Sequence, residues 1–147
     1  METEQTNVPV SAGWLGGLGA VPFVGLAGAL PWLAGGIKPL VVQALLAYGA
    51  TILSFLGGVH WGLAIKIPPG DGLKARLVLS VLPSLVAWIA LLAGAQLGLM
   101  LLALAIAAML WVDLRATRLG HAPLWYPKLR LPLSAIVFSA LVFGALA

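Results

Sequence analysis

Five apolar runs, separated by short polar or Gly- and Pro-containing segments, most constrain what this chain can fold into. The runs are expected at about residues 14–34, 40–65, 77–93, 97–112 and 131–147. For the last run, which is short for a span, a start within residues 126–130 is the alternative. About 17–25 apolar residues can cross a bilayer as a helix, which satisfies its own backbone hydrogen bonds there. Only 8% of the 147 residues are charged, whereas soluble domains carry about 25%. The sequence therefore predicts an all-α integral membrane bundle of five transmembrane helices.

The domain organisation is predicted to be simple. Residues 1–12 are polar and Pro-interrupted and are expected to form a disordered cytoplasmic tail, and residues 13–147 form a single membrane domain. Five spans would place seven of the eight basic residues on one side of the membrane: Lys66, Lys74, Arg76, Arg115, Arg118, Lys128 and Arg130. Because basic loops stay in the cytoplasm, we predict a cytoplasmic N-terminus and an outside C-terminus, in a bacterial inner membrane.

Several classes of function are disfavoured by what the sequence lacks. The net charge of +4 comes from basic residues placed between apolar runs, which is a topology signal and predicts no nucleic-acid partner. With no cysteine and only two histidines, no metal site is predicted. A phosphate-binding loop, a dinucleotide fingerprint and a Gly-x-Ser-x-Gly elbow are all missing. We therefore predict no catalytic residues, lean against an enzyme, and assign no cofactor.

The second expected span carries small and polar residues that a merely apolar helix would not need. At about 100° per residue, Gln43, Thr51 and Gly58 fall on one side of this helix, which is called here the seam. Small residues at such spacings allow helices to approach closely, which predicts helix packing at Gly57, Gly58 and Gly62. His60 falls off this seam and must face another helix, a cavity or the headgroups. The fourth span lacks such features and is expected to be the most lipid-exposed.

Polar and aromatic residues gather at the cytoplasmic ends of the spans. They predict a ligand pocket whose candidate residues are His60, Trp61, Arg76, Asp113, Trp125, Tyr126 and Arg130. His60 and Asp113 would form its floor, and the Trp125-Tyr126 segment would cover it. The alternative is structural, because aromatic and basic residues also mark membrane interfaces and buried ionisable groups usually pair. Asp113 would then pair with Arg76, Arg115 or Arg130.

Three segments resemble the signatures of an uncharacterised membrane-protein family that includes the mitochondrial transmembrane protein 69 of animals. They are Phe55-Leu-Gly-Gly-Val-His-Trp-Gly62, Ser80-Val-Leu-Pro-Ser-Leu-Val-Ala-Trp88 and Pro123-Leu-Trp-Tyr-Pro-Lys-Leu-Arg130. The pairs Pro22-Phe23 and Tyr48-Gly49 fit the same pattern. The resemblance implies a fold and a membrane location, but the family carries no established activity.

Three functional hypotheses follow. The first is an accessory or assembly protein that contacts partner proteins within the lipid bilayer, in a larger membrane complex such as one of the respiratory chain. The second is a binder of a small amphipathic ligand, namely a quinone, a tetrapyrrole or a lipid, in the cytoplasmic-face pocket. The third is a membrane enzyme acting on lipid or quinone, with His60 and Asp113 as acid and base.

Overall fold

The computed structural model describes residues 6–147, and this part of the chain contains helices and no strand. A short 3₁₀ helix, η1 (Leu30–Trp32), follows the first of five long helices: α1 (Val10–Ala29), α2 (Ile37–Ala64), α3 (Asp71–Leu92), α4 (Ala95–Arg118) and α5 (Tyr126–Leu146). Each long helix is long and apolar enough to cross a membrane. The predicted all-α bundle of five transmembrane helices is confirmed.

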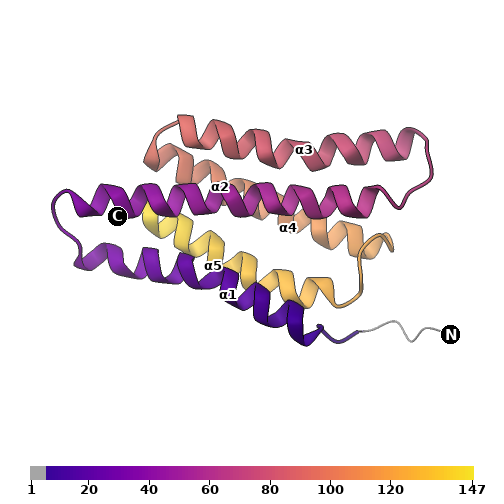
Figure 1. Ribbon diagram of the computed structural model, residues 1–147, viewed down its shortest axis with the longest axis horizontal. Coiled ribbons are helices and arrows are strands. Elements are labelled where there is room, and N and C mark those ends of the chain that lie inside the picture. Colours follow the sequence, from indigo (N-terminus) through magenta and orange to yellow (C-terminus); the bar gives the residue numbers. More distant parts are fainter. Residues whose placement is uncertain (1–5) are drawn as a thin grey trace.

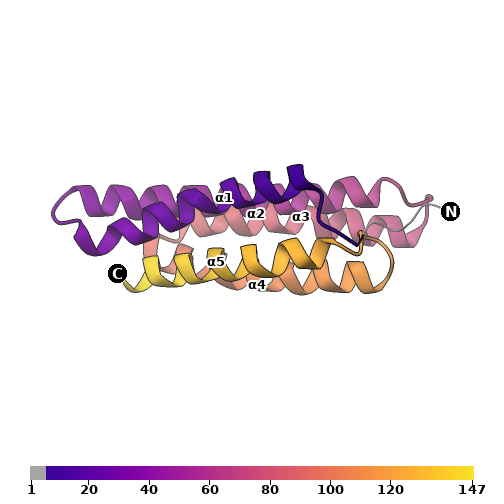
Figure 2. The ribbon, with the colours of Figure 1, turned by 90° about the horizontal axis from the view of Figure 1, so that it is seen from below.

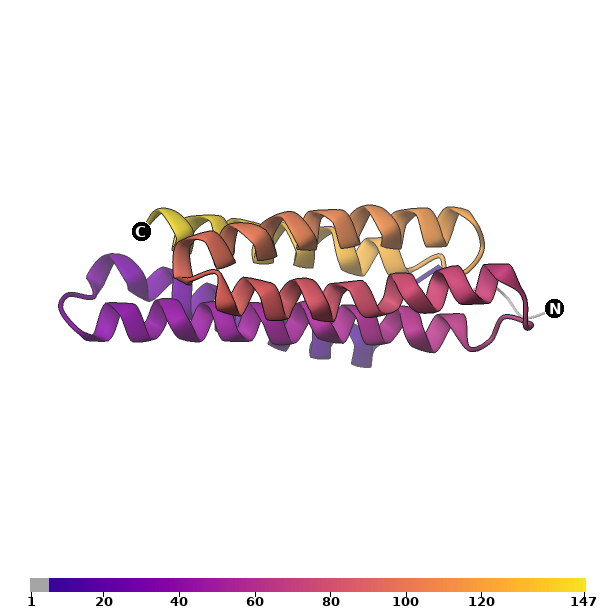
Figure 3. The ribbon, with the colours of Figure 1, turned by 90° about the horizontal axis from the view of Figure 1, so that it is seen from above.

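The helices lie side by side in two layers. Helices α1, α2 and α3 form one layer, and α4 and α5 pack across it (Figures 2 and 3). The α2–α3 and α4–α5 connections lie at the same end of the bundle, whereas the α1–α2 and α3–α4 connections lie at the opposite end (Figure 1). Most of the basic residues are therefore brought to one end, which also holds the candidate site.

The core is built from aliphatic side chains of all the long helices together with one aromatic pair. The rings of Phe23 on α1 and Tyr48 on α2 lie 4.9 Å apart, and the Tyr48 hydroxyl donates a 2.9 Å hydrogen bond to the Gly19 carbonyl. Helix α4 contributes the fully buried Leu99 and Leu102, so the expectation that the fourth span is the most lipid-exposed is wrong. Lipid and protein interior are both apolar, and a featureless apolar helix suits either.

Two glycines allow α3 to be held closely between its neighbours. A Cβ added to Gly57 of α2 would clash with the Ser80 carbonyl oxygen, and one added to Gly98 of α4 would clash with the Ala90 carbonyl oxygen. Both carbonyls belong to α3, so its backbone touches the backbones on either side. At the α3–α4 connection, Gly94 has a φ of +87°, a conformation that glycine adopts without strain.

The predicted packing role of the glycines in α2 holds at one position of three. Gly57 is buried against α3, whereas a Cβ at Gly58 or at Gly62 would meet no atom within 4 Å. The seam that contains Gly58 faces away from the bundle, so its small residues do not mediate packing within this chain. Adjacent residues on a helix point about 100° apart, which explains why the two neighbouring glycines differ.

The helices at the site end are longer than the expected spans. Helix α4 continues to Arg118 and α5 begins at Tyr126, which leaves residues 119–125 as the connection instead of the expected 114–130. Of the tail expected to be disordered, residues 1–5 lie outside the described residues, and α1 already begins at Val10.

Candidate functional site

A buried ionic cluster joins three helices near the basic end. Asp113 of α4 is fully buried. Its Oδ1 accepts a 2.6 Å hydrogen bond from His60 Nε2 of α2, and its Oδ2 accepts a 2.6 Å bond from Arg130 Nε of α5. A buried carboxylate is costly unless it is paired and hydrogen-bonded, and here both of its oxygens have partners. Of the three arginines considered as partners of Asp113, Arg130 is the one that binds it.

The bond to Asp113 determines what the rest of the His60 ring can do. A carboxylate oxygen only accepts hydrogen bonds, so Nε2 carries the proton that bonds Asp113. The other nitrogen, Nδ1, then accepts a hydrogen bond when the ring is neutral and donates one when the ring is protonated. His60 also lines a cavity, so one residue connects the ionic cluster with a space that a ligand can enter.

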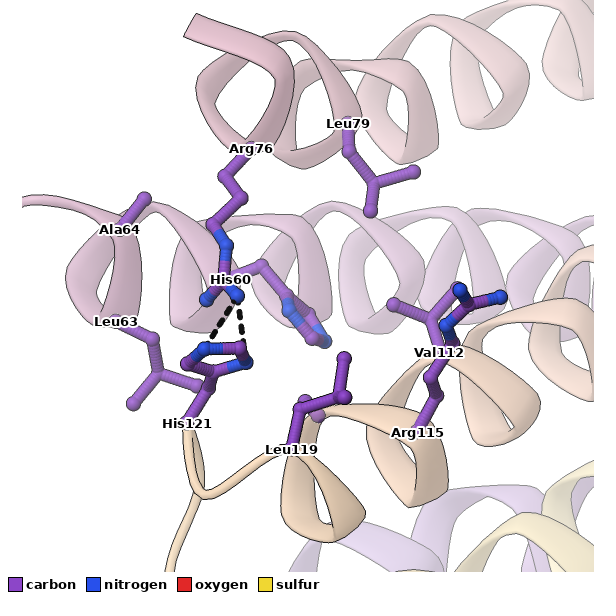
Figure 4. A pocket seen from close by; sticks show the side chains of 10 residues that line it. His60, Leu63, Ala64, Arg76, Leu79, Val112, Arg115, Leu119 and His121 are labelled. Carbon is purple, nitrogen blue, oxygen red and sulfur yellow. Dashed lines mark hydrogen bonds between the residues drawn. The ribbon is translucent and has the colours of Figure 1, made fainter. Parts of the chain in front are cut away.

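That cavity, called here the inner pocket, has a volume of about 180 Å³ and lies between the ends of α2, α3 and α4 (Figure 4). Ten residues line it: His60, Leu63, Ala64, Arg76, Leu79, Val112, Arg115, Ala116, Leu119 and His121. Four of them are basic and six are apolar. Among the side chains that the structure describes, no carboxylate lines the inner pocket, so its charge is positive and its walls are apolar.

The basic groups of the inner pocket have neighbours that position them. Arg76 Nη2 lies 2.7 Å from His121 Nε2 and also contacts Nδ1 of the same ring (Figure 4). Desolvation and then the positive charge of Arg76 lower the pKa of His121 from its ordinary value of 6.5. A neutral His121 offers the acceptor nitrogen that the Arg76 guanidinium needs. Arg115 lies over the Trp111 ring, with its guanidinium carbon 5.3 Å from the ring centre.

A second cavity, called here the outer cavity, adjoins the first. It measures about 400 Å³ and shares Leu63 and His121 with the inner pocket. Its other lining residues are Lys66, Gly120, Ala122, Pro123, Leu124 and Trp125. The ring of Trp125 also contacts that of Tyr126 edge-on, with ring centres 6.0 Å apart. The segment expected to cover the pocket thus lies beside the outer cavity, and only Trp125 of the pair lines it.

The predicted site residues fall into separate places. His60 and Arg76 line the inner pocket, Trp125 lines the outer cavity, and Asp113 and Arg130 are buried behind His60. Tyr126 is half-buried at the start of α5. Trp61 is 47% exposed and lines neither cavity, because it lies one helical step from His60 and points to the outer surface of α2.

The sequence prediction left three basic lining residues out of the site: Lys66, Arg115 and His121. For Arg115 a signal exists, because it is three residues from Val112 and four from Leu119, and these spacings place all three on one helix face. Lys66 and His121 lie in connections between helices, where helical spacing gives no direction.

Comparisons with known proteins identify the family of the chain. Residues 8–146 match the family model described as "Protein of unknown function (DUF3429)". The chain belongs to the DUF3429 family. Transmembrane protein 69 of Xenopus tropicalis is 37% identical to it over 139 residues, which are 92% of this chain and 54% of that protein. For transmembrane protein 69 of Mus musculus the identity is 28% over 129 residues, 82% of this chain and 53% of that protein.

These matches confirm the resemblance drawn from the three sequence segments and support a multi-pass membrane protein. The DUF3429 chain spans about half the length of the curated relatives that it matches. No solved structure matches it significantly. Neither the family description nor the relatives' names state an activity, so a functional argument depends on the site itself.

Proposed function

We propose that this DUF3429 protein binds the anionic headgroup of an amphipathic molecule in the inner pocket. The observation that carries the proposal is the convergence of four basic side chains, His60, Arg76, Arg115 and His121, on a cavity with apolar walls. An arginine guanidinium forms short, charge-assisted hydrogen bonds to phosphate and carboxylate oxygens. Arg115 and His121 are exposed, so a headgroup can reach these side chains from outside the bundle.

The charge of the site selects among the ligands considered from the sequence. A quinone is neutral and gains little from two guanidinium groups, whereas a lipid phosphate or a tetrapyrrole carboxylate neutralises them. Leu79, Val112 and Leu119 offer contact surface for the apolar part of such a molecule. His60, held by Asp113 on one nitrogen, can present the other to an acidic or a hydroxyl oxygen of the headgroup.

The same charges suggest where the pocket lies relative to the membrane. The end of the bundle with the inner pocket also holds the α2–α3 and α4–α5 connections (Figure 1). Most of the basic residues lie in these connections or in the helix ends beside them. Under the positive-inside rule, we propose that this end faces the cytoplasm. We further propose a bacterial inner membrane as the location. The ligand would then enter from the cytoplasmic leaflet or from the cytoplasm.

A matched pair of arginine variants tests the proposal. The protein is reconstituted in phosphatidylcholine nanodiscs, and binding of phosphatidylglycerol or of a tetrapyrrole dicarboxylate is measured. Arg115→Gln should weaken binding about tenfold or more, since hydrogen bonds to charged groups contribute about 1.5–3 kcal/mol. The control is Arg118→Gln, because Arg118 is exposed on the same helix and lines neither cavity. Equal losses in the two variants would indicate nonspecific attraction and contradict the proposal.

A second candidate function is contact with a partner membrane protein, and the outward face of α2 favours it. Gln43, Ala47, Thr51, Gly58 and Trp61 are all exposed on this helix. The space beside Gly58 is open, so another helix can approach closely there. The Thr51 hydroxyl already donates a 3.0 Å hydrogen bond to its own helix. Lipid can therefore cover this face at little cost, and a partner would bind through shape more than through polar bonds.

The partner hypothesis is tested by enlarging Gly58. A Cβ at Gly58 meets no atom of the chain within 4 Å, and leucine favours a helix over glycine. The purified Gly58→Leu variant should therefore unfold at the temperature of the parent or above it. If an accessory function uses this face, a membrane protein that co-purifies stoichiometrically with the parent should be lost with the variant. Unchanged co-purification would remove α2 from the interface.

A further inference from the structure

We infer that the ligand carries two anionic groups, one bound in the inner pocket and the second in the outer cavity. The inference rests on the proposed function, since it names the ligand class of the same site. Its starting point is that the two cavities adjoin each other, share Leu63 and His121, and both contain basic side chains. A ligand confined to one of them would contact only part of this basic lining.

The charges of the two cavities set the number of anionic groups. Arg76 and Arg115 line the inner pocket, and Lys66 lines the outer cavity. No carboxylate among the described side chains lines either space, and both oxygens of Asp113 are already bonded to His60 and Arg130. An anion bound beside a basic side chain gains a favourable Coulomb interaction with it. A single phosphate in the inner pocket would not use Lys66, which lines only the outer cavity.

The divider between the cavities is built from side chains. His121 belongs to both linings and accepts the Arg76 hydrogen bond (Figure 4). A linker between two anionic groups would therefore pass beside the His121 ring. A bound anion in the inner pocket can compete with His121 for the guanidinium of Arg76, because a charged acceptor makes a stronger bond than a neutral ring nitrogen.

The walls indicate that the ligand is amphipathic. Leu79 and Val112 face the inner pocket, and Leu124 and Trp125 face the outer cavity. Apolar contact therefore accompanies the charge in both spaces. A lipid with two phosphates joined by a short linker fits this pattern, and a soluble diphosphate supplies the same anionic groups without the apolar body.

The test compares ligands with one and with two phosphates at equal total charge. The full chain in phosphatidylcholine nanodiscs is given cardiolipin, or phosphatidylglycerol at twice the mole fraction. Linking two bound groups raises the effective concentration of the second, so cardiolipin should bind about tenfold tighter or better. Equal binding would overturn the inference. If phosphatidylglycerol binding still depends on Arg115, the proposed function survives that result.

Lys66→Gln separates the two binding sites. It should reduce the preference for cardiolipin to about threefold or less while phosphatidylglycerol binding remains. The control is Lys74→Gln, because Lys74 is exposed and lines neither cavity. An unchanged preference in the Lys66 variant would overturn the assignment of the second anionic group to the outer cavity.

Soluble competitors identify the source of the anionic groups. Inorganic pyrophosphate and inorganic phosphate are added at equal charge to the lipid-bound protein. Displacement by pyrophosphate and not by phosphate would support a two-anion ligand that comes from solution. Displacement by neither, with the cardiolipin preference intact, would support a lipid. Equal displacement by both would contradict two linked binding sites.

Discussion

The paired glycines of α2 give a sharp test of the packing, because they are neighbours in sequence with opposite surroundings. In Gly57→Ala the new Cβ would clash with the Ser80 carbonyl oxygen and lie 3.3 Å from Pro83 Cβ. Neither obstacle can rotate away, since one is backbone and the other a proline ring. Helices α2 and α3 must therefore separate. Extra atoms in a well-packed interior cost about 1–3 kcal/mol.

Gly58→Ala is the matched control, because its Cβ would meet no atom within 4 Å. Alanine favours a helix over glycine by about 1 kcal/mol, and this gain is common to both variants. The difference between the variants therefore isolates the clash at Gly57, and should be about 1–3 kcal/mol in the free energy of unfolding. Denaturation in mild detergent, followed by tryptophan fluorescence, measures it. Equal stability of the two variants would refute the close α2–α3 contact.

Two further predictions concern charge. Asp113→Asn should lower the free energy of unfolding by about 3–5 kcal/mol, because it leaves the buried Arg130 guanidinium without its counter-charge. The double variant Asp113→Leu, Arg130→Met should recover most of that loss, because it removes both charges together. A double variant as unstable as Asp113→Asn would contradict this reasoning. Acidification should loosen the 119–125 connection: the lowered pKa of His121 means that the unfolded loop takes up a proton first as pH falls below 6.5. The contact between His121 and Arg76 is therefore intact above pH 6.5 and lost below the lowered pKa of His121. Amide hydrogen exchange of residues 119–125 should report this change, and His121→Gln should remove its pH dependence.

The number and type of helices were predictable because hydropathy alone determines them, whereas the helix boundaries at the site end were not. Helix α5 begins at Tyr126, whereas its span was expected from residue 131, with a start within residues 126–130 as the alternative. The later start leaves Arg130 in the loop, and an isolated charge is costly in a span. The structure pairs Arg130 with Asp113 at 2.6 Å. Hydropathy counts residues one at a time and does not register such a pair.

The candidate site was predictable in its general position and in three lining residues, His60, Arg76 and Trp125, but not in its pairings. A sequence shows that His60 leaves the seam of α2, yet the rotation of each helix decides what faces it. That rotation also makes Arg76 the neighbour of His121 and leaves Asp113 to Arg130.

The family segments turn out to meet one another. Gly57 of the first segment packs on Ser80 and Pro83 of the second, and His60 and Arg130 meet at Asp113. The segments are separate patterns in the sequence, whereas the contacts between them come from the packing of the helices.

The ion pair between adjacent helices also bears on how the chain enters a membrane. Asp113 and Arg130 are 17 residues apart in sequence and lie in α4 and α5, which form a hairpin. Alone, an aspartate or an arginine in a membrane helix is costly to insert, up to about 2.5–3.5 kcal/mol at the helix centre and less towards its ends, where Asp113 and Arg130 lie. Entering together, the two residues neutralise each other without help from the rest of the protein. Helices α4 and α5 thus suit insertion as one unit, into a membrane where α2 and its His60 are already present.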